Sequence, residues 1–233
     1  AASDVYKRQT GLYVRGGGAD ENLYLLDGNP VYHVNHLLGF FSAFNPDAIK
    51  NTRFYKGSFP AEYGGRLSSV VDVRMNDGNR QEYHGNISVG LLSARANLEG
   101  PIVKDRSSFN VSVRRTWLDL ITGTALAIIN KNSDTKESFG YHFFDINAKV
   151  NHSFSERSRA YLSFYMGQDA FRQGSKEKHE DSDDMFLWRW GNLIGSAGWN
   201  YVFGQKLFGN LMVGYSRFRS HIPVSYTHLR AHE

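Results

Sequence analysis

From about residue 80 onward, apolar and polar side chains alternate along the chain in short stretches. The clearest stretch sets Phe144, Ile146, Ala148 and Val150 against Asp145, Asn147, Lys149 and Asn151. A period of two places each set on one face of a β-strand. Similar alternation occupies residues 86–91, 94–99, 109–116, 161–166, 192–201 and 207–216. We therefore expect about seven antiparallel strands, each with one apolar and one polar face.

The connections between these strands alternate in length. Residues 100–107, 155–158 and 204–206 are short and polar, whereas residues 118–140 and 172–184 are long. A transmembrane β-barrel has short periplasmic turns and long external loops, and its strands turn one face to lipid and the other to a wet lumen. A soluble β-sandwich also alternates, but the polar faces here carry Asn, Ser, Gly and Arg rather than a typical solvated mixture. The apolar run 118–130 is too short to span a bilayer and predicts an external-loop helix or a segment packed in the lumen.

The preceding residues follow a different, glycine-rich pattern. Residues 11–28 read as strand, glycine loop and strand, and end in the tight-turn pair Asp27-Gly28. Residues 45–50 read as a short helix, with Asn45 as N-cap and Pro46 at the first position. We expect a small α+β domain over residues 10–79 and a barrel wall over residues 80–223.

Five runs in this first domain carry a family resemblance. They are Val14-Arg15-Gly16, Leu26-Asp27-Gly28-Asn29-Pro30-Val31, Asn45-Pro46-Asp47-Ala48-Ile49, Tyr55-Lys56-Gly57 and residues 60–70. In this order they resemble the plug domain of TonB-dependent outer-membrane receptors, and the last run is most similar to receptors of Bacteroidota. The resemblance implies an all-β transmembrane barrel, with about seven of its 22 strands in this chain, preceded by part of a plug.

The resemblance also implies a function. A receptor of this family lies in the bacterial outer membrane and actively takes up a scarce solute, namely a siderophore, vitamin, oligosaccharide or peptide. The partners it implies are TonB, acting through an N-terminal box upstream of this sequence, the solute, outer-membrane lipid and a surface lipoprotein as a further candidate. It implies neither a cofactor nor an enzymatic activity.

Two sets of residues are the candidates for the site. The plug motif comprises Arg15, Gly16, Asp27, Gly28, Pro30, Lys56, Gly57, Tyr63, Gly64, Gly65 and Arg66. The lumen-facing candidates of the wall are Arg95, Glu99, Arg114, Asp145, Asn147, Lys149 and Asn192. Arg15 and Arg66 are either solvated or paired with wall carboxylates, of which Glu99 is one candidate. We also expect Val150→Arg, which faces lipid, to cost about 2–4 kcal/mol and Lys149→Ala, which faces water, to cost little.

Both ends of the chain look foreign. The codons that fit Asp4–Gln9 have a reverse complement that encodes Val-Ser-Tyr-Thr-His, the sequence found at residues 224–228. We therefore interpret residues 1–9 and 224–233 as translated sequencing adapters around a metagenomic fragment, and leave them out of the fold prediction.

Composition and other motifs narrow the alternatives. The formal charge of +4 comes from scattered Lys and Arg, so nucleic acid is not an expected partner. The absence of cysteine removes disulfides and Cys-ligated metals. The pair His33 and His36 is interpreted as plain loop histidines, and the acidic residues 179–184 as a solvated loop, so no metal or catalytic set is expected. The alternative function is a soluble β-rich glycan-binding module, with Tyr161, Tyr165, Trp188 and Trp190 as platforms.

Overall fold

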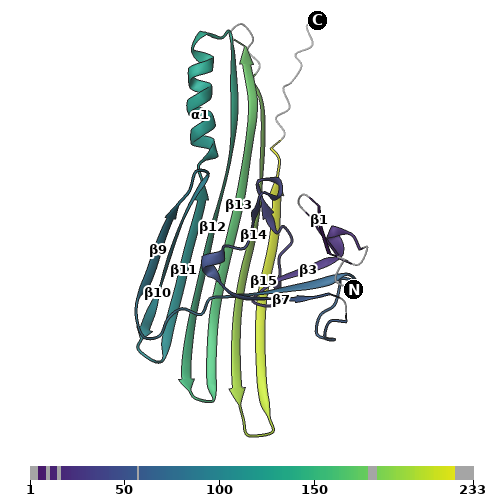
Figure 1. Cartoon of the computed structure of the whole chain (residues 1–233), viewed down its shortest axis with the longest axis vertical. Coiled ribbons are helices and arrows are strands. Elements are labelled where there is room, and N and C mark those ends of the chain that lie inside the picture. The colour runs from purple at the N-terminus through teal and green to yellow at the C-terminus, as the bar shows by residue number, and fades with distance from the viewer. Residues whose placement is uncertain (1–4, 9–10, 15–16, 57, 178–182, 224–233) are drawn as a thin grey trace, which may run out of the picture.

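The computed structural model describes residues 5–8, 11–14, 17–56, 58–177 and 183–223. It consists of a tall, curved sheet and a smaller domain that packs against one face of that sheet (Figure 1). Among the candidates, Arg15, Gly16 and Gly57 lie outside the described residues. Residues 5–8 pair with residues 11–14, so part of the segment that we set aside as foreign forms a strand, and its foreign origin stays a prediction.

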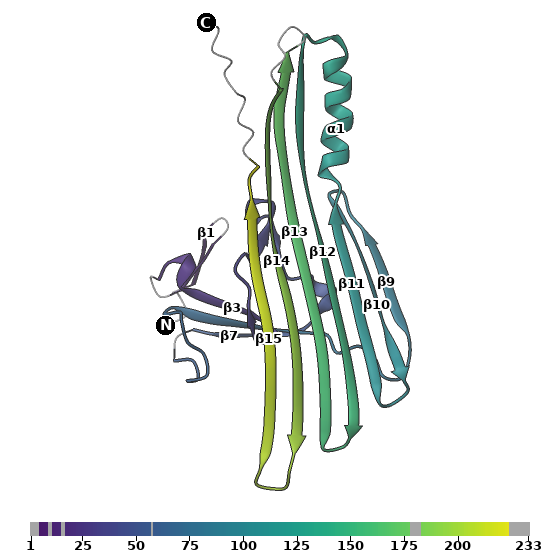
Figure 2. The same cartoon turned by 180° about the vertical axis from the view of Figure 1, so that it is seen from behind.

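The tall sheet is an antiparallel meander of seven strands. Its strands are β9 (His84–Val89), β10 (Ser93–Val103), β11 (Ser107–Thr116), β12 (Thr135–Ser155), β13 (Ser158–Glu177), β14 (Asp183–Val202) and β15 (Phe208–His221). Each strand pairs with the next along the chain, so that β9 and β15 form the two edges of the described sheet. This arrangement confirms the predicted antiparallel barrel wall, and Figure 2 shows the turns β10–β11, β12–β13 and β14–β15 at one end and α1 at the other.

The wall is taller than the pattern predicted. The predicted long loop over residues 172–184 is wrong over most of its length, because β13 continues to Glu177 and β14 begins at Asp183. Register pairs such as Gly140 with Arg172 extend the ladder here. The two faces of this upper part do not alternate cleanly between apolar and polar residues, so the period-two signal fades while the backbone pairing continues.

The predicted apolar connection contains one helix, α1 (Leu118–Ile129), followed by the 3-10 turn η4 (Asn130–Asn132). The helix stands at the end of the wall opposite the short turns (Figure 1). It has no buried residue, so it is not a segment packed inside the lumen. In the described part of the chain, no helix has both the length and the apolar character that a membrane crossing requires.

The smaller domain is built on a four-stranded sheet in the order β4-β3-β8-β7. These strands are β3 (Asn22–Leu26), β4 (Asn29–Pro30), β7 (Ile49–Tyr55) and β8 (Ser69–Met75), and β3 pairs with β8 in parallel. Shorter elements complete it: β1 (Val5–Arg8), β2 (Gly11–Val14), β5 (Asn35–His36), β6 (Phe41–Ser42), η1 (Ala19–Glu21), η2 (Leu37–Gly39) and η3 (Pro46–Ala48). The turn between β3 and β4 places both Asp27 and Gly28 at positive φ, as the tight-turn pair predicted.

The expected helix at residues 45–50 is only the single 3-10 turn η3, after which β7 begins. Its start agrees with the pattern: Asn45 Oδ1 accepts a hydrogen bond from the Asp47 backbone N–H at 3.3 Å, and Pro46 follows the cap. The β-branched Ile49 then enters the antiparallel ladder with β8, so the turn does not grow into a helix.

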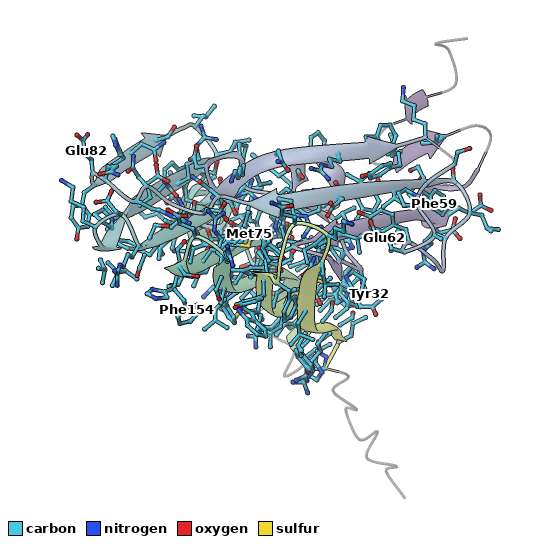
Figure 3. All side chains as sticks on the ribbon, turned by 90° about the horizontal axis from the view of Figure 1, so that it is seen from below. Tyr32, Phe59, Glu62, Met75, Glu82 and Phe154 are labelled. Atoms are coloured by element: carbon cyan, nitrogen blue, oxygen red, sulfur yellow. The ribbon has the colours of Figure 1, made fainter. Side chains whose placement is uncertain are left out.

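The small domain and the tall sheet share a hydrophobic core. Its strands β3 and β7 run across the tall strands in Figure 1. Leu26, Val73 and Met75 of the small domain pack in one cluster with Tyr165 and Ile194 of the wall. Figure 3, seen from below, places Met75 where the two parts meet and Phe59 and Glu62 at the far end of the small domain. The polar face of the wall is therefore covered by protein at this level.

Candidate functional site: the interface between plug and wall

The two faces of the wall have opposite composition and opposite exposure. On the covered face, Asn110, Ser112 and Asp145 are fully buried. On the other face of the same strands, Val150 is 41% exposed and Leu162 is 64% exposed. The row Phe144, Ile146, Ala148 and Val150 thus lies on the outward face, and polar side chains from the wall meet the small domain. Chemistry at this interface is therefore ionic and hydrogen-bonded around a limited apolar core.

Lys149 on β12 forms the lower centre of this interface. Its side chain is buried, and Nζ lies 3.2 Å from Asp27 Oδ1 and 3.1 Å from Asp77 Oδ1. The ammonium also donates to the Met75 carbonyl at 3.1 Å. Asp27 in turn accepts a hydrogen bond from the Met75 backbone N–H at 3.1 Å. Lys149 of the wall is thus bound to the β3–β4 turn and to the end of β8 in the small domain.

This burial corrects the expectation for Lys149→Ala. The residue faces the lumen side as predicted, but it is only 5% exposed and does not face water. Removing one partner of a buried ion pair leaves the other charge uncompensated, which is strongly destabilising. A small cost for this substitution is therefore no longer expected.

The chain leaves the small domain through Asp77 and Gly78, which lie against the wall. The Asp77 carbonyl accepts hydrogen bonds from Ser108 Oγ at 2.6 Å and from Asn151 Nδ2 at 3.0 Å. Gly78 has φ of +79°, and a Cβ there would run into the Phe109 carbonyl. Burial alone would raise the pKa of Asp77, but the hydrogen bonds and charges of Lys50 and Lys149 lower it below its ordinary value. The exit from the small domain is thus fastened to the wall through both backbone and charge.

His36 forms a second buried node higher on the wall. Its Nδ1 lies 2.7 Å from Asp169 Oδ2, and its Nε2 lies 3.5 Å from Asp145 Oδ2. The ring stacks on Phe143, with centroids 4.1 Å apart and an interplanar angle of 5°. The interpretation of His36 as a plain loop histidine is therefore wrong, because a short loop of the small domain inserts it between two wall carboxylates.

The titration of His36 follows from these neighbours. Burial alone lowers the pKa of its imidazole, but the hydrogen bond to Asp169 and the nearby carboxylates of Asp145 and Asp169 raise the pKa above its ordinary value of 6.5. Tyr141 donates its hydroxyl to Asp169 and accepts the Leu37 backbone N–H at 2.5 Å. In the described part of the chain, no group of three or more His, Asp or Glu side chains is arranged to hold a metal ion.

Arg114 completes this node. It donates to Asp145 Oδ2 from Nε at 2.9 Å and from Nη2 at 2.6 Å, and Nη2 also donates to the Ser42 carbonyl at 2.7 Å. The guanidinium lies over the Phe143 ring, 5.0 Å from its centroid. Two cationic side chains, His36 when protonated and Arg114, thus balance the two carboxylates Asp145 and Asp169.

Smaller polar contacts continue along the interface. Asn45 Nδ2 donates to Ser112 Oγ at 2.6 Å, and Arg95 Nε lies 2.9 Å from Asp47 Oδ2. Asn192 Nδ2 donates to the His33 carbonyl at 2.7 Å. On the edge strand β15, Ser216 Oγ donates to the Pro30 carbonyl at 2.5 Å, and on β14 Ser196 Oγ accepts a hydrogen bond from Asn29 Nδ2.

The structure brings some of the predicted site residues together and separates others. Asp27, Arg95, Arg114, Asp145, Lys149 and Asn192 all contact across the interface. Glu99 accepts from Asn76 at 2.8 Å, and Asn147 is buried on the covered face. Arg66, however, is exposed and donates to the carbonyl of its neighbour Gly65, so the structure favours a solvated Arg66 over one paired with Glu99.

Other members of the plug motif lie away from the wall. Gly64 and Gly65 are exposed, and Lys56 lies over the Phe54 ring at 5.7 Å. Tyr63 packs against Tyr55, with ring centroids 5.5 Å apart. Gly28 and Pro30, by contrast, lie beside β15, where a Cβ on Gly28 would meet the Met212 side chain. The motif therefore marks two different surfaces of the small domain.

Sequence reasoning missed the upper half of the interface. Asp169 and Tyr141 were not candidates, although each lies an even number of residues from a predicted lumen-facing position on its own strand. Extending the period-two pattern beyond the predicted strand ends would have found both. The acidic residues 179–182 lie outside the described residues.

A sheet with an exposed apolar outer face and a polar inner face filled by a separate small domain defines a plugged membrane barrel. Residues 2–71 match the family model described as TonB-dependent Receptor Plug Domain. No curated protein sequence matches the chain.

Solved structures of receptors resemble the chain at low identity. The siderophore receptor PirA from Acinetobacter baumannii has 14% identity and a TM-score of 0.44, covering 91% of this chain and 42% of that one. A mutant of the ferric enterobactin receptor PfeA from Pseudomonas aeruginosa has 13% identity and a TM-score of 0.47, with coverages of 91% and 43%. The siderophore receptor PirA from Pseudomonas aeruginosa has 16% identity and a TM-score of 0.43, covering 91% and 44%. The chain thus spans less than half of the length of these receptors.

Residues 2–71, which contain most of the small domain, therefore match the plug domain of TonB-dependent receptors, as the motifs predicted. The resemblance of this domain to the plug is thereby confirmed, and transport by the whole protein belongs to the proposed function below. The division of the chain at residues 9, 79 and 223 and the Bacteroidota origin stay predictions.

Proposed function

We propose that the protein of which this chain forms plug and wall actively takes up a scarce solute through a plug-gated barrel. The solute is a siderophore, vitamin, oligosaccharide or peptide, and TonB supplies the pull on a segment upstream of the plug. The observation that carries the proposal is the polar character of the plug–wall interface, centred on Lys149 and His36. The proposal needs no cofactor and no nucleic acid, and a surface lipoprotein partner stays a prediction.

The reason is energetic. A purely apolar interface would hold the plug in the wall through its buried apolar area. Ion pairs and hydrogen bonds, in contrast, can be replaced by contacts with water when the plug moves. Elements that move in function are drawn from the regions of lower local stability. A plug held by hydrogen bonds and ion pairs around a limited apolar core therefore suits a domain that opens and reseats.

A reversible cross-link tests this proposal directly. The chain contains no cysteine, so Asn45→Cys with Ser112→Cys introduces one isolated pair, at side chains that are 2.6 Å apart in the native structure. We expect the oxidised complete receptor to lose solute uptake and to regain it when a reductant opens the disulfide. Uptake that continues with the plug locked to the wall would overturn the proposal.

The matched control joins two strands of the wall. Leu98 and Val111 are register partners on the outward face of β10 and β11. A disulfide between cysteines at these positions joins strands that are already paired, so we expect uptake to be unchanged. Mass spectrometry of the intact receptor verifies that each disulfide has formed.

The alternative of a soluble glycan-binding module fits the side chains less well. Two of its four platforms, Tyr165 and Trp190, are only 2% and 4% exposed, because the plug covers them. A soluble module would also leave the outward apolar row in water, which is costly. Fractionation of the complete gene product decides between the two, since recovery as a stable soluble monomer would favour the module.

A further inference from the structure

The outward face of β15 changes character halfway along the strand. Leu211, Val213 and Tyr215 occupy its lower part, and Arg217, Arg219 and His221 follow at the same two-residue spacing. The alternate residues face the plug, as Ser216 shows by donating to Pro30. The apolar row and the cationic row are therefore one continuous face, which turns away from the lumen.

Neighbouring strands add to the cationic part of this face. Register pairing places Leu193 beside Arg217, Gly191 beside Arg219 and Arg189 beside His221. Arg189, Arg217 and Arg219 are all exposed. In the part of the chain that the structure describes, none of the three forms a salt bridge with an acidic side chain. Within the described residues, three cations thus share one surface and none is paired with an acidic side chain.

This surface is hollowed. A shallow depression of about 440 Å³ is lined by Arg189, Arg217 and Arg219 together with Met166, Gly191 and Leu193. Gly191 lies between the arginines and has no side chain, and a Cβ there would run into the Gly167 carbonyl of β13. The depression therefore has cationic walls and an apolar lower margin.

Its height on the wall fits the margin of a bilayer. The arginines lie beyond the outward apolar residues, toward the end of the sheet that carries α1 rather than the short turns (Figure 2). Short turns mark the periplasmic end of an outer-membrane barrel. Arginine at the bilayer midplane is costly, whereas at the interface its guanidinium reaches the headgroups while its stem covers apolar surface. The outer leaflet is thus the membrane surface next to this depression.

We propose that Arg189, Arg217 and Arg219 bind the phosphate group of an outer-leaflet lipid, whose acyl chains lie along Leu193, Tyr215 and Met166. The guanidinium fork matches phosphate oxygens in bidentate geometry, which favours arginine over lysine in such sites. The inference rests on the membrane orientation in the proposed function, and assigns to this wall a specific lipid contact rather than general solvation.

Lipid retention by the purified complete receptor tests the inference. The receptor is mixed in detergent with lipid A carrying its two phosphates, or with the dephosphorylated lipid, and bound lipid is counted by native mass spectrometry. We expect the phosphorylated lipid to be retained and the double substitution Arg217→Gln with Arg219→Gln to weaken retention about tenfold. Arg217→Lys with Arg219→Lys keeps the charge but not the fork, and should fall between the two.

The matched control removes the same charge at the opposite end of the wall. Arg106 and Arg157 are exposed in the short turns, where Asp105 and Glu156 lie beside them. Arg106→Gln with Arg157→Gln should leave lipid retention unchanged. If the double glutamine variant at the proposed site does not fold, the single substitution Arg189→Gln serves in its place.

Several outcomes would overturn the inference. Equal retention by the parent and by the Arg217/Arg219 variant would do so, as would equal retention of the two lipids. Displacement of the lipid by millimolar inorganic phosphate would indicate a free-anion site instead. A receptor that fractionates outside the outer membrane contradicts the proposed function, whereas one that fractionates there but retains no phosphorylated lipid contradicts only this inference.

Discussion

The two faces of β12 lie in opposite surroundings although their residues alternate one by one. Lys149 and Asp145 on one face are buried, while Val150 on the other is exposed. In a soluble protein the apolar face would be buried and the polar face exposed. The difference shows that alternation reports only which residues share a face, and that a second domain decides whether a polar face meets water or protein.

The largest expected effect comes from the covered face. Lys149→Met should cost about 3–5 kcal/mol of stability, because Asp27 is left buried without the cation that faces it. Equilibrium unfolding of the complete receptor in detergent measures it. Lys50→Met is the control, since Lys50 approaches the same Asp77 at 2.6 Å but is 53% exposed, and should cost at most about 1 kcal/mol. Equal costs at the two lysines would mean that water reaches Lys149 on the covered face.

On the outward face, Val150→Arg should cost about 2–4 kcal/mol near the middle of a bilayer. The cost arises from transferring a cation into hydrocarbon, so it should appear in lipid bilayers and shrink in a detergent that lets water reach the side chain. Unfolding in vesicles and in micelles compares the two. Val150→Leu keeps the apolar surface and should be close to neutral; a similar cost for both variants would place Val150 in a packed protein core.

The upper node should make stability depend on pH. The pKa of His36 is raised in the folded protein, so its contribution is fully present below the unfolded value near 6.5 and is lost as pH rises through the folded pKa. The groups facing it are Asp145, Asp169, Arg114 and Tyr141 of the wall and His33 of the plug.

His36→Gln should remove about 1.5–3 kcal/mol at low pH, the range for hydrogen bonds to charged groups, and should flatten the pH dependence. The measurement is thermal unfolding of the complete receptor between pH 5 and pH 9. His84→Gln is a suitable control, because that histidine is 53% exposed and lies 3.9 Å from Glu82. A pH profile that keeps its shape in His36→Gln would exclude this histidine as its source.

The smallest effect is expected in the plug motif itself. Arg66 is exposed and donates only to a neighbouring carbonyl, so Arg66→Ala should change stability by less than about 0.5 kcal/mol. A loss of several kcal/mol would require a wall partner for this arginine. The same unfolding assay used for Lys149 gives the comparison.

The parts of the fold that were predictable depend on local patterns. The row Phe144 to Val150 placed β12 and its outward face, and Asp27-Gly28 placed the turn between β3 and β4. The upper wall was not predictable in this way, because residues near Arg172 pair through the backbone without a clean apolar alternation.

The site was predictable only in part for a different reason. Alternation indicated that Lys149 and Asp145 face the lumen, but the identity of their partners depends on how two domains dock. His36 looked like a loop residue because nothing in its sequence neighbours marks the two carboxylates that it meets, which lie more than a hundred residues away. Arg66 is the converse case: it belongs to the family motif but is exposed, because membership of a motif does not specify a contact.

The parallel pairing of β3 with β8 has a mechanical consequence. Tension applied upstream of β3 and resisted where Asp77 is fastened to the wall pulls the two strands from opposite ends. This geometry loads the β3–β8 pair in shear, so that all of its backbone hydrogen bonds share the force. The side-chain contacts between plug and wall, in contrast, each bear force singly. Force of this kind favours sliding of an intact sheet along the wall before that sheet unravels.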